Sequence, residues 1–340
     1  MYTIQPQVSL QPFNTFGIQA IAQYFVTITS IGDVQQLIKT PLFGKERHLI
    51  LGGGSNLLLT QDFNGLIIKN EIKGIEILKE IDDTITLKVG AGENWHTFVL
   101  HCVNQDWGGV ENLSLIPGTV GAAPMQNIGA YGVEIKDIID SVEVVNLQDG
   151  TVSNFTNYAC NFGYRESIFK QSHRDKYLIS SITLTLTKKN HRFNASYGSI
   201  MDVLRDKGIA EPSVKAISDA VVQIRRSKLP DPAHIGNAGS FFKNPSINTE
   251  TLEHLKLDYP NIPSFPGEKG LKKISAAWLI EQCGWKGKTF NNIGVHQHQA
   301  LVLVNYGGGS GKNIWQLAMD IQASVKEKFN IILQPEVNVI

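Results

Sequence analysis

Cysteine is scarce in this chain of 340 residues. Its three cysteines, Cys102, Cys160 and Cys283, lie far apart, and no C-x-x-C pair occurs. This number and spacing exclude a disulfide framework and argue against a zinc site held by cysteine pairs. Unpaired thiols are typical of a reducing compartment, so we expect a cytoplasmic protein.

The chain also lacks an excess charge of either sign and a long apolar run. Lysine and arginine number 31, and aspartate and glutamate also number 31. Without net charge, no overall field attracts the chain to nucleic acid or to an anionic membrane. No apolar run approaches transmembrane length, and the first basic residue is Lys39, so the N-terminal segment does not resemble a signal peptide. We therefore expect neither nucleic acid nor membrane as a partner.

Three common functional motifs are missing. Gly52 and Gly54 are followed by Leu57 where the dinucleotide fingerprint G-x-G-x-x-G requires a third glycine. Residues 306–313 imitate a P-loop, but its first glycine is replaced by tyrosine and its magnesium-binding serine or threonine by asparagine. Ser240 lies in a run of small residues without G-x-S-x-G, which argues against a hydrolase nucleophile and favours a turn-forming serine.

Glycine, by contrast, is concentrated in two stretches, residues 52–56 and 111–132. The first follows an apolar run at 48–51, and the second combines glycines with Pro117 and Pro124. Such segments pack poorly as helices or central strands, but they bring bare backbone N–H groups close to a ligand, an arrangement that suits phosphate oxygens. An ordinary long loop is the alternative. Because the dinucleotide fingerprint is absent, we predict a diphosphate site of another design.

Alternating strand-like and helix-like segments predict an α+β protein. In residues 1–70 we expect a small α/β domain; its strands are placed at 22–28, 47–51 and 65–69, and its helix at 33–39, closed by Pro41. In residues 71–212 we expect a second, α+β domain. It has a strand at 84–89, a helix from Trp95, strands at 141–147 and 177–187, a hairpin turn at 148–150 and a short helix before 210.

Residues 213–325 and 326–340 are expected to form a third domain and a closing strand. Ser213 is placed as the N-cap of a helix that ends in basic residues, which are typical of dipole compensation. A helix at 274–283, a strand at 300–304 and a helix capped by Asn313 follow. The closing strand, 331–339, carries Glu336, which must be exposed, paired or functional in an apolar run.

Histidine gives no metal site. His296 and His298 would share one face of a strand, as metal ligands can, but no third ligand stands nearby in the sequence. His96 and His101 lie off the apolar stripe of their helix and are interpreted as solvated. We predict no metal.

Taken together, the motifs resemble the UDP-N-acetylenolpyruvoylglucosamine reductase family, flavoenzymes of bacterial cell-wall precursor synthesis. The resemblance covers nearly the whole chain. Its motifs are NTFG at 14–17, GGGSN at 52–56, AGENW at 91–95, IPG at 116–118, QNIGAYG at 126–132, FGYRES at 162–167, KLPDP at 228–232, NAGSFFKNP at 237–245 and PEV at 335–337. The segment around Tyr197 resembles the tyrosine loop of the first subtype.

The resemblance implies a fold and a cofactor. Two N-terminal subdomains of the vanillyl-alcohol-oxidase (PCMH) type would bind FAD without a covalent link, and a C-terminal α+β domain would bind the substrate. The residues expected to contact FAD are Gly52, Gly53, Gly54, Ser55, Asn56, Leu57, Pro117, Gly118, Thr119, Gly121, Ala122, Asn127, Ile128, Gly129 and Gly132.

It also implies a reaction and its residues. NADPH would reduce FAD, and UDP-N-acetylglucosamine enolpyruvate would then take the hydride at C3 and a proton at C2. Ser240 would donate that proton, while Arg165 and Glu336 would polarise and stabilise the enolic carboxylate. The UDP-sugar contacts expected by resemblance are Tyr197, Lys228, Asn244 and Gln299. We expect a monomer.

Two alternatives stay open. An FAD oxidase that passes electrons to oxygen would leave Ser240 and Glu336 without a role. A flavin- or UDP-sugar-binding protein that has lost turnover is opposed by the intact catalytic residues.

Overall fold

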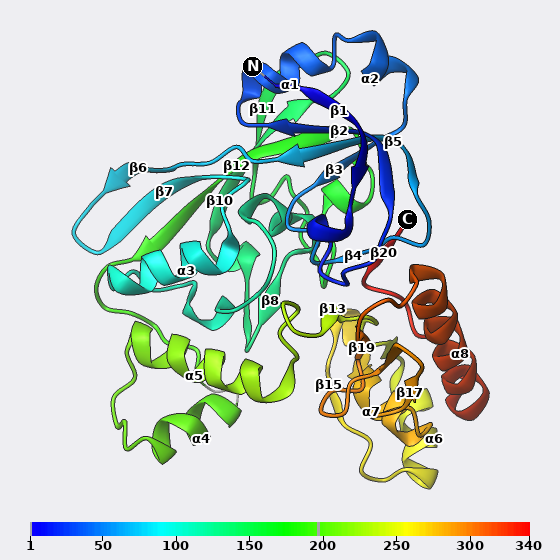
Figure 1. Ribbon diagram of the computed structural model, residues 1–340. Helices are drawn as coiled ribbons and strands as arrows, with labels where there is room; N and C mark the ends of the chain where they lie inside the picture. Colours follow the sequence, from blue (N-terminus) through cyan, green and yellow to red (C-terminus); the bar gives the residue numbers. More distant parts are fainter. Residues whose placement is uncertain (1, 196–197) are drawn as a thin grey trace. The chain divides into compact units, whose positions relative to one another are not determined.

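The computed structural model describes residues 2–195 and 198–340. The chain forms two compact units, each built from separate segments. Unit 1 comprises the described residues of Met1–Val8, Ala22–Gly53 and Asn64–Ser227, and unit 2 comprises Ser9–Ile21, Gly54–Phe63 and Lys228–Ile340. Helices and strands are mixed in both units, as expected for an α+β protein (Figure 1). The domain boundaries expected from the sequence stay a prediction.

The first sheet of unit 1 has four strands in the order β1-β2-β5-β3. Its strands are β1 (Ile4–Ser9), β2 (Ile21–Ile28), β3 (His48–Leu51) and β5 (Phe63–Asn70). β3 and β5 are parallel, and two short helices, α1 (Ile31–Leu37) and α2 (Pro41–Lys45), connect β2 to β3. The sequence analysis expected Pro41 to close a helix. Instead, Pro41 is the first residue of α2. Thr40 caps α2 by accepting a hydrogen bond from the Phe43 N–H, and proline is well tolerated at a first helical position.

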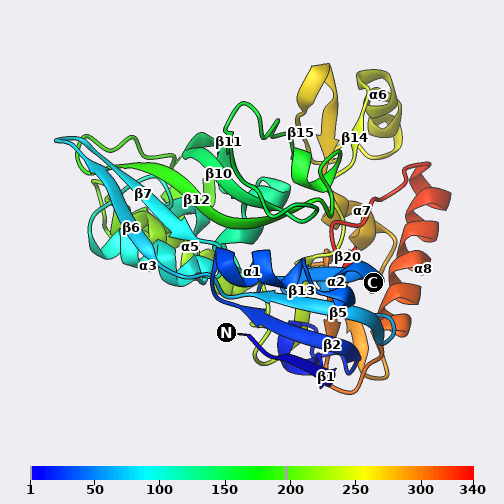
Figure 2. The same cartoon turned by 90° about the horizontal axis from the view of Figure 1, so that it is seen from above.

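The second sheet of unit 1 has five antiparallel strands in the order β11-β10-β12-β7-β6. Its strands are β6 (Ile75–Glu80), β7 (Thr84–Gly90), β10 (Ile139–Asn146), β11 (Val152–Thr156) and β12 (Tyr177–Thr187). The hairpin turn expected between β10 and β11 is confirmed, because the Gly150 N–H donates to the Asn146 carbonyl at 2.8 Å. The β6–β7 hairpin projects at one edge of this sheet (Figures 1 and 2).

Three longer helices complete unit 1: α3 (Trp95–Asn104), α4 (Gly198–Asp206) and α5 (Val214–Lys228). The apolar stripe expected for α3 is confirmed, since Trp95, Phe98, Val99, Cys102 and Val103 are all buried. Ser213 caps α5 as expected, because its hydroxyl accepts a hydrogen bond from the Ala216 N–H at 3.1 Å. α3 packs with the five-stranded sheet in one core, and α4 packs with α5 in another.

The glycine-rich stretch of unit 1 and the residues after it form short 3-10 helices and one two-residue β-hairpin. The 3-10 helices are η2 (Glu111–Leu113), η3 (Val120–Ala122), η4 (Pro124–Gln126) and η5 (Ile135–Asp137), and the hairpin pairs β8 (Gly129–Ala130) with β9 (Val133–Glu134). The indole N–H of Trp95 donates to the Leu113 carbonyl at 2.9 Å and fixes the start of the stretch to α3. A further turn, η6 (Ile168–Lys170), precedes β12.

Unit 2 contains a four-stranded sheet, β13-β19-β18-β17, and a three-stranded sheet, β14-β16-β15. The strands are β13 (Gly236–Ser240), β14 (Ser246–Ile247), β15 (Ser264–Pro266), β16 (Lys272–Ile274), β17 (Thr289–Phe290), β18 (Ile293–Val295) and β19 (Val302–Asn305). β4 (Leu57–Leu58) pairs in parallel with β20 (Asn338–Val339).

The helices of unit 2 are α6 (Thr249–Asp258), α7 (Ala276–Gln282) and α8 (Gly311–Phe329), with short turns η1 (Gln11–Phe13) and η7 (Glu268–Gly270). The prediction that Asn313 caps α8 is wrong. Ser310 is the cap, and its hydroxyl accepts a hydrogen bond from the Asn313 N–H at 3.2 Å.

The closing strand predicted at 331–339 is also largely wrong. Only Asn338–Val339 form a strand, and Pro335 makes an isolated bridge to Phe242. Around this bridge the Lys243 N–H donates to the Gln334 carbonyl at 2.9 Å and the Glu336 N–H to the Phe241 carbonyl at 2.8 Å.

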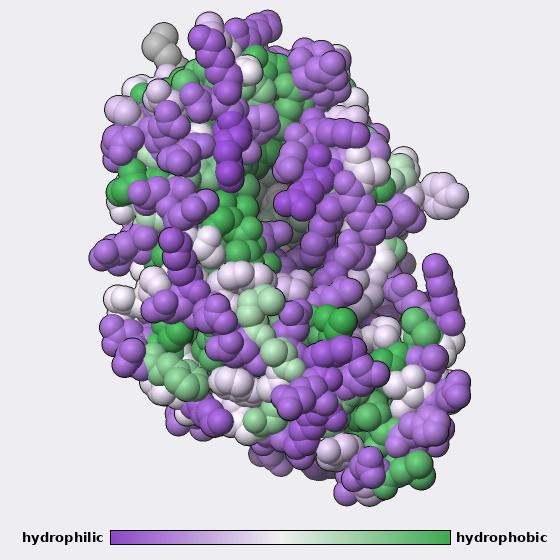
Figure 3. All heavy atoms as spheres, turned by 90° about the vertical axis from the view of Figure 1, so that its right-hand side faces the viewer, coloured by the Kyte–Doolittle hydropathy of each residue, from purple (hydrophilic) through white to green (hydrophobic). Residues whose placement is uncertain are grey.

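In the part of the chain that the structure describes, no helix is long and apolar enough to cross a membrane. On the face drawn in Figure 3, hydrophilic side chains surround scattered hydrophobic ones.

Candidate functional site

The two glycine stretches meet in unit 1. A Cβ atom added to Gly52 would lie 2.5 Å from the Thr119 hydroxyl, and one added to Gly53 would lie 2.8 Å from the Gly118 Cα atom. Only glycine permits so close an approach of two backbones. We call these four residues the glycine crossing. No side chain at Gly52, Gly53 or Gly118 covers the backbone here, which suits a ligand held by main-chain groups.

The N-terminal end of α3 supports the glycine crossing. The Trp95 N–H donates to the Gly118 carbonyl at 3.0 Å, and the Val120 N–H donates to the Glu93 carbonyl at 2.9 Å. Asn94, the N-cap of α3, also forms a bridge with Thr119. A helix N-terminus carries a partial positive charge, so the crossing combines bare backbone with a dipole that favours an anion.

Arg165 lies on a tight turn in the same unit. Gly163 and Glu166 exchange two backbone hydrogen bonds around it, at 3.0 and 3.2 Å, and Arg165 adopts a left-handed φ of 57°. Its guanidinium donates from Nη2 to the Gly129 carbonyl at 2.9 Å. The glycine-rich stretch and the predicted catalytic arginine are therefore brought together.

Sequence reasoning missed Arg225. Its Nε atom is buried and has no hydrogen-bond partner among the described residues. Burial lowers the pKa of the Arg225 guanidinium, the Tyr131 hydroxyl opposes that shift, and the positive charge of Arg165 adds to it. The sequence placed Arg225 in a last helical turn, where dipole compensation was the default. It lies 60 positions from Arg165 in the chain, so no local pattern linked the two.

His96 was expected to be solvated, and that prediction is wrong. Its Nδ1 accepts a hydrogen bond from the Leu115 N–H at 2.9 Å, so the ring braces the glycine-rich stretch. Burial and then the charges of Arg226 and Arg225 lower the pKa of His96, which favours the neutral ring that this bond requires.

Ser240 and Glu336 are brought together in unit 2. Ser240 ends β13 opposite Val302 of β19, after Gly239 with a φ of 70°. The Glu336 N–H donates to the carbonyl of Phe241, the residue next to Ser240, at 2.8 Å. Both Ser240 and Glu336 are half-buried. Arg165 belongs to unit 1, whereas these two residues belong to unit 2.

The second part of the GGGSN motif lies beside Glu336. The Asn56 side-chain amide donates to the Glu336 carbonyl at 3.2 Å, and the Asn338 N–H donates to the Asn56 carbonyl at 3.1 Å. A Cβ at Gly54 would lie 2.0 Å from the Phe13 carbonyl oxygen, so only glycine fits against that segment. Asn56 thus makes a direct contact with the segment that carries Glu336. The sequence analysis did not foresee this contact.

Three of the four expected UDP-sugar contacts, Lys228, Asn244 and Gln299, belong to unit 2. Asn244 accepts the Ala276 N–H at 2.9 Å with its side-chain oxygen, and Gln299 accepts the Leu301 N–H at 3.3 Å in the same way. Both amides keep NH₂ groups that can donate to a ligand. Lys228 is exposed at the end of α5. Tyr197 lies outside the described residues.

Within the described ranges, no group of three His, Cys, Asp or Glu side chains could hold a metal ion. His296 and His298 lie with their ring centroids 5.5 Å apart.

Two segments of the chain match known families. Residues 22–156 match an FAD-binding domain, and residues 231–340 match the C-terminal domain of UDP-N-acetylenolpyruvoylglucosamine reductase. The first match contains the whole glycine crossing and α3, and the second contains Ser240 and Glu336. The FAD-binding match fits a site built from bare backbone without the dinucleotide fingerprint.

Relatives match over the full chain. A protein of Amoebophilus asiaticus named UDP-N-acetylenolpyruvoylglucosamine reductase is 50% identical, with 99% of each chain covered. One of the same name from Flavobacterium johnsoniae is 47% identical, again with 99% of each chain covered. The fold resembles the crystal structure of the reductase from Thermus caldophilus, with a TM-score of 0.70 and 20% identity over 100% of this chain and 99% of that one. The chain belongs to the UDP-N-acetylenolpyruvoylglucosamine reductase family.

Proposed function

We propose that this protein reduces UDP-N-acetylglucosamine enolpyruvate to UDP-N-acetylmuramate with NADPH as the hydride donor. As a member of its family with an FAD-binding domain, it is an FAD-containing oxidoreductase of peptidoglycan precursor synthesis. The identity of the donor and the roles of single residues are the proposal. The observation that carries it is the full-length relationship at 50% identity.

The glycine crossing fits a non-covalently bound FAD. When bound, FAD accepts a hydride from one substrate and passes it to the next. The backbone of Gly52, Gly53, Gly118 and Thr119 would hold its diphosphate. A side chain at Gly52 would collide with the Thr119 hydroxyl, and one at Gly53 would collide with the Gly118 backbone, so the crossing keeps its main chain bare. The N-terminal turn of α3 adds a favourable dipole.

Arg165 would bind the enolpyruvyl carboxylate. Its guanidinium presents a planar fork that matches a carboxylate, which a lysine would not reproduce. Nη2 is already bonded to the Gly129 carbonyl, so the orientation of the fork is set before the substrate arrives. A preorganised cation stabilises negative charge that develops on the carboxylate as hydride reaches C3.

Ser240 would deliver the proton to C2, and Glu336 would assist at the carboxylate. A serine hydroxyl is a weak acid, so its position must supply much of the effect. The pairing of β13 with β19 and the bond from the Phe241 N–H to the Leu301 carbonyl, 2.7 Å long, fix that position. The backbone of Glu336 is held on one side by Phe241 and on the other by Asn56.

Lys228, Asn244, Gln299 and Tyr197 would bind the UDP-sugar. Lys228 supplies positive charge for the diphosphate in a chain that has no net charge to offer.

The visible spectrum of the purified protein under anaerobic conditions tests this function. A flavin spectrum that is bleached by NADPH and restored only by the enolpyruvyl substrate is the expected result. Bleaching that air reverses quickly but the substrate does not would indicate an oxidase. A protein that stays colourless after FAD is added would contradict the flavoenzyme assignment.

A further inference from the structure

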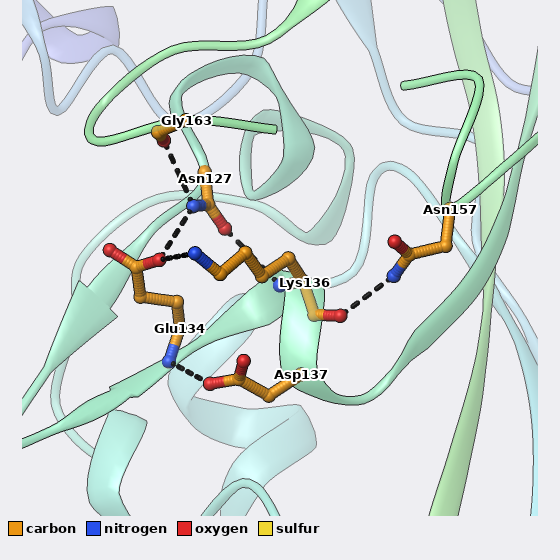
Figure 4. A network of polar contacts seen from close by, with 6 residues as sticks. All are labelled: Asn127, Glu134, Lys136, Asp137, Asn157 and Gly163. Atoms are coloured by element: carbon orange, nitrogen blue, oxygen red, sulfur yellow. Dashed lines mark hydrogen bonds and ion pairs between the residues drawn. The ribbon is translucent and has the colours of Figure 1, made fainter. Parts of the chain in front are cut away.

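The side chain of Asn127 is buried inside unit 1 and is not aimed at solvent. Its backbone adopts a left-handed φ of 46° at the end of η4, a conformation that asparagine tolerates better than most residues. Figure 4 shows the polar network around it, with Glu134, Lys136 and Gly163 in direct contact.

Every polar atom of the Asn127 amide has a protein partner. Its nitrogen donates to Glu134 Oε2 and to the Gly163 carbonyl, both at 3.0 Å. Its oxygen accepts the Lys136 N–H at 3.2 Å. Because a backbone N–H can only donate, the orientation of the amide is fixed by its surroundings. Asn127 was assigned to the cofactor by resemblance, but its side chain is fully used within the protein.

The Gly163 carbonyl connects Asn127 to Arg165. The same carbonyl accepts the Glu166 N–H and so closes the turn at residues 163–166. Arg165 stands in this turn with its left-handed φ of 57°. A non-glycine residue there costs on the order of 1 kcal/mol, and it persists only where neighbouring structure enforces it. Asn127 supplies that support from outside the turn.

Glu134 supports the guanidinium of Arg165 indirectly, through Gly129. Glu134 pairs with Gly129 in the β8–β9 hairpin, and the Gly129 carbonyl accepts the Arg165 guanidinium. A Cβ at Gly129 would lie 2.8 Å from Glu134 Cγ and 3.3 Å from Arg165 Nη1, so the three groups are closely packed. Glu134 also pairs with Lys136 Nζ at 2.7 Å and accepts the Asn127 amide, which links both ends of Arg165 to one carboxylate.

We propose that Asn127 is a positioning residue for Arg165, acting through the Gly163 carbonyl in the step in which the enolpyruvyl substrate accepts its hydride and proton. This inference rests on the proposed function. Asn127 touches no reacting atom. It fixes the turn from which the Arg165 fork meets the carboxylate, and a displacement of about 1 Å in such a group can cost roughly 100-fold in rate.

The substitution Asn127→Asp tests this. Aspartate has the same shape, but it lacks both NH₂ donors and would place an acceptor against Glu134 and the Gly163 carbonyl. In anaerobic stopped-flow measurements we expect flavin reduction by NADPH to stay within about twofold of the unsubstituted protein, and reoxidation by the enolpyruvyl substrate to slow by roughly 10- to 100-fold. Bound FAD and its visible spectrum should be unchanged. If the buried charge prevents folding, Asn127→Ala removes the same donors without a charge, and the same split is expected.

Asn157 provides a matched control. Its side-chain amide donates to the carbonyls of Lys136 and Ile139, both at 2.7 Å, and so braces the same network without contacting the turn at 163–166 (Figure 4). Asn157→Ala should leave both half-reactions within about twofold, even if thermal stability falls.

Three outcomes overturn the inference. Equal slowing of both half-reactions in the Asn127 variants, or loss of FAD from them, would make Asn127 merely structural. If Asn157→Ala slowed the second half-reaction as much as the Asn127 variants do, any loosening of the network would slow this step, and the contact of Asn127 with Gly163 would have no particular role. Failure of the proposed function is distinguishable, because the unsubstituted protein itself would then not be reoxidised by the substrate.

Discussion

At the scale of single residues, the proposed role of Ser240 as proton donor predicts different effects on the two half-reactions. Ser240→Ala should leave reduction by NADPH nearly intact and slow reoxidation by the enolpyruvyl substrate by roughly 10²- to 10⁴-fold, because only the second half-reaction needs a proton at C2. Anaerobic stopped-flow spectra measure the two rates separately. Ser246→Ala, at an exposed serine of the same unit, should change neither. Equal loss of both rates in Ser240→Ala would show that the serine only supports the turn.

Gly53 is the residue at which we expect an added methyl group to weaken FAD binding. Gly53→Ala would place Cβ 2.8 Å from the Gly118 Cα atom, a backbone atom that cannot move aside cheaply. We expect the purified variant to lose most of its bound FAD, measured as absorbance near the flavin band relative to protein.

Gly44 is the matched control for Gly53. It lies in α2 of the same unit, and a Cβ there would meet nothing within 4 Å. Gly44→Ala should keep its FAD and gain up to about 1 kcal/mol of helix stability. Full FAD binding by Gly53→Ala would contradict the role of the glycine crossing.

Single residues also mark the limit of the sequence analysis. The glycine stretches were identified from composition because bare backbone is visible in a sequence. The catalytic candidates came from resemblance, and Ser240 alone would have been read as a turn former. The contact of Asn127 with Gly163 and the electrostatic effect of Arg165 on Arg225 could not be foreseen, since they join residues that are 36 and 60 positions apart in the sequence.

At the scale of elements, Ser310 and not Asn313 begins α8. Ser310→Ala removes the acceptor for the Asn313 N–H and should lower the free energy of unfolding by about 1 kcal/mol. Asn313→Ala keeps the backbone donor and should be close to neutral. Urea unfolding of both variants measures the difference, and a larger loss in Asn313→Ala would restore the original assignment.

The five-stranded sheet contains a half-buried ion pair whose contribution depends on pH. Burial alone would raise the pKa of Glu143, but hydrogen bonds from Lys88 and Ser180, the Lys88 charge and a bond from Ser181 outweigh it and hold the pKa below its ordinary value. A lowered pKa stabilises the fold above the unfolded value, about 4.3, and this stabilisation is lost as pH falls through the folded value.

Glu143→Gln should therefore lower the free energy of unfolding by about 1 kcal/mol at pH 7, and the difference should shrink as the pH drops below about 4. Glu76→Gln, at an exposed carboxylate of β6 in the same sheet, should have a smaller effect. A difference for Glu143→Gln that does not vary with pH would show that its charge is not involved.

Elements with strong periodicity were predicted well, and short irregular ones were not. α3, α5 and β12 carry clear apolar stripes and were placed within a few residues. β6 was not predicted, and all six of its residues are exposed, so it has no buried face. The closing segment carries enough apolar residues for a strand, but its pairing is limited to the bridge at Pro335 and the two residues of β20.

At the scale of the whole molecule, unit 2 is not a continuous stretch of sequence. The segments Ser9–Ile21 and Gly54–Phe63 belong to it, although each is followed or preceded by strands of unit 1. Sequence reasoning proceeds along the chain and so expected contiguous domains, in which residues 1–70 stay together. Tertiary pairing, such as β4 with β20, links positions that are about 280 residues apart and leaves no local trace.

This organisation predicts that residues 228–340 do not fold alone. The missing segments supply β4, the partner of β20, and the Phe16 carbonyl that accepts the Asn305 amide at 2.8 Å. They also carry five fully buried large side chains, Leu10, Phe16, Leu58, Leu59 and Phe63. At about 2 kcal/mol each, their burial is worth roughly 10 kcal/mol, which equals the total stability of an ordinary domain.

An isolated fragment of residues 228–340 should therefore show poorly dispersed amide resonances and no cooperative thermal transition, whereas the full chain under the same conditions should show both dispersion and a sharp transition. The amide protons of β18 and β19 are the most informative, because these strands are central in the unit 2 sheet and exchange slowly only in a stable fold. A fragment that unfolds cooperatively, with those amides protected, would show that the C-terminal segment is stable without Phe16 and β4, and that the two short segments are additions to an independent domain.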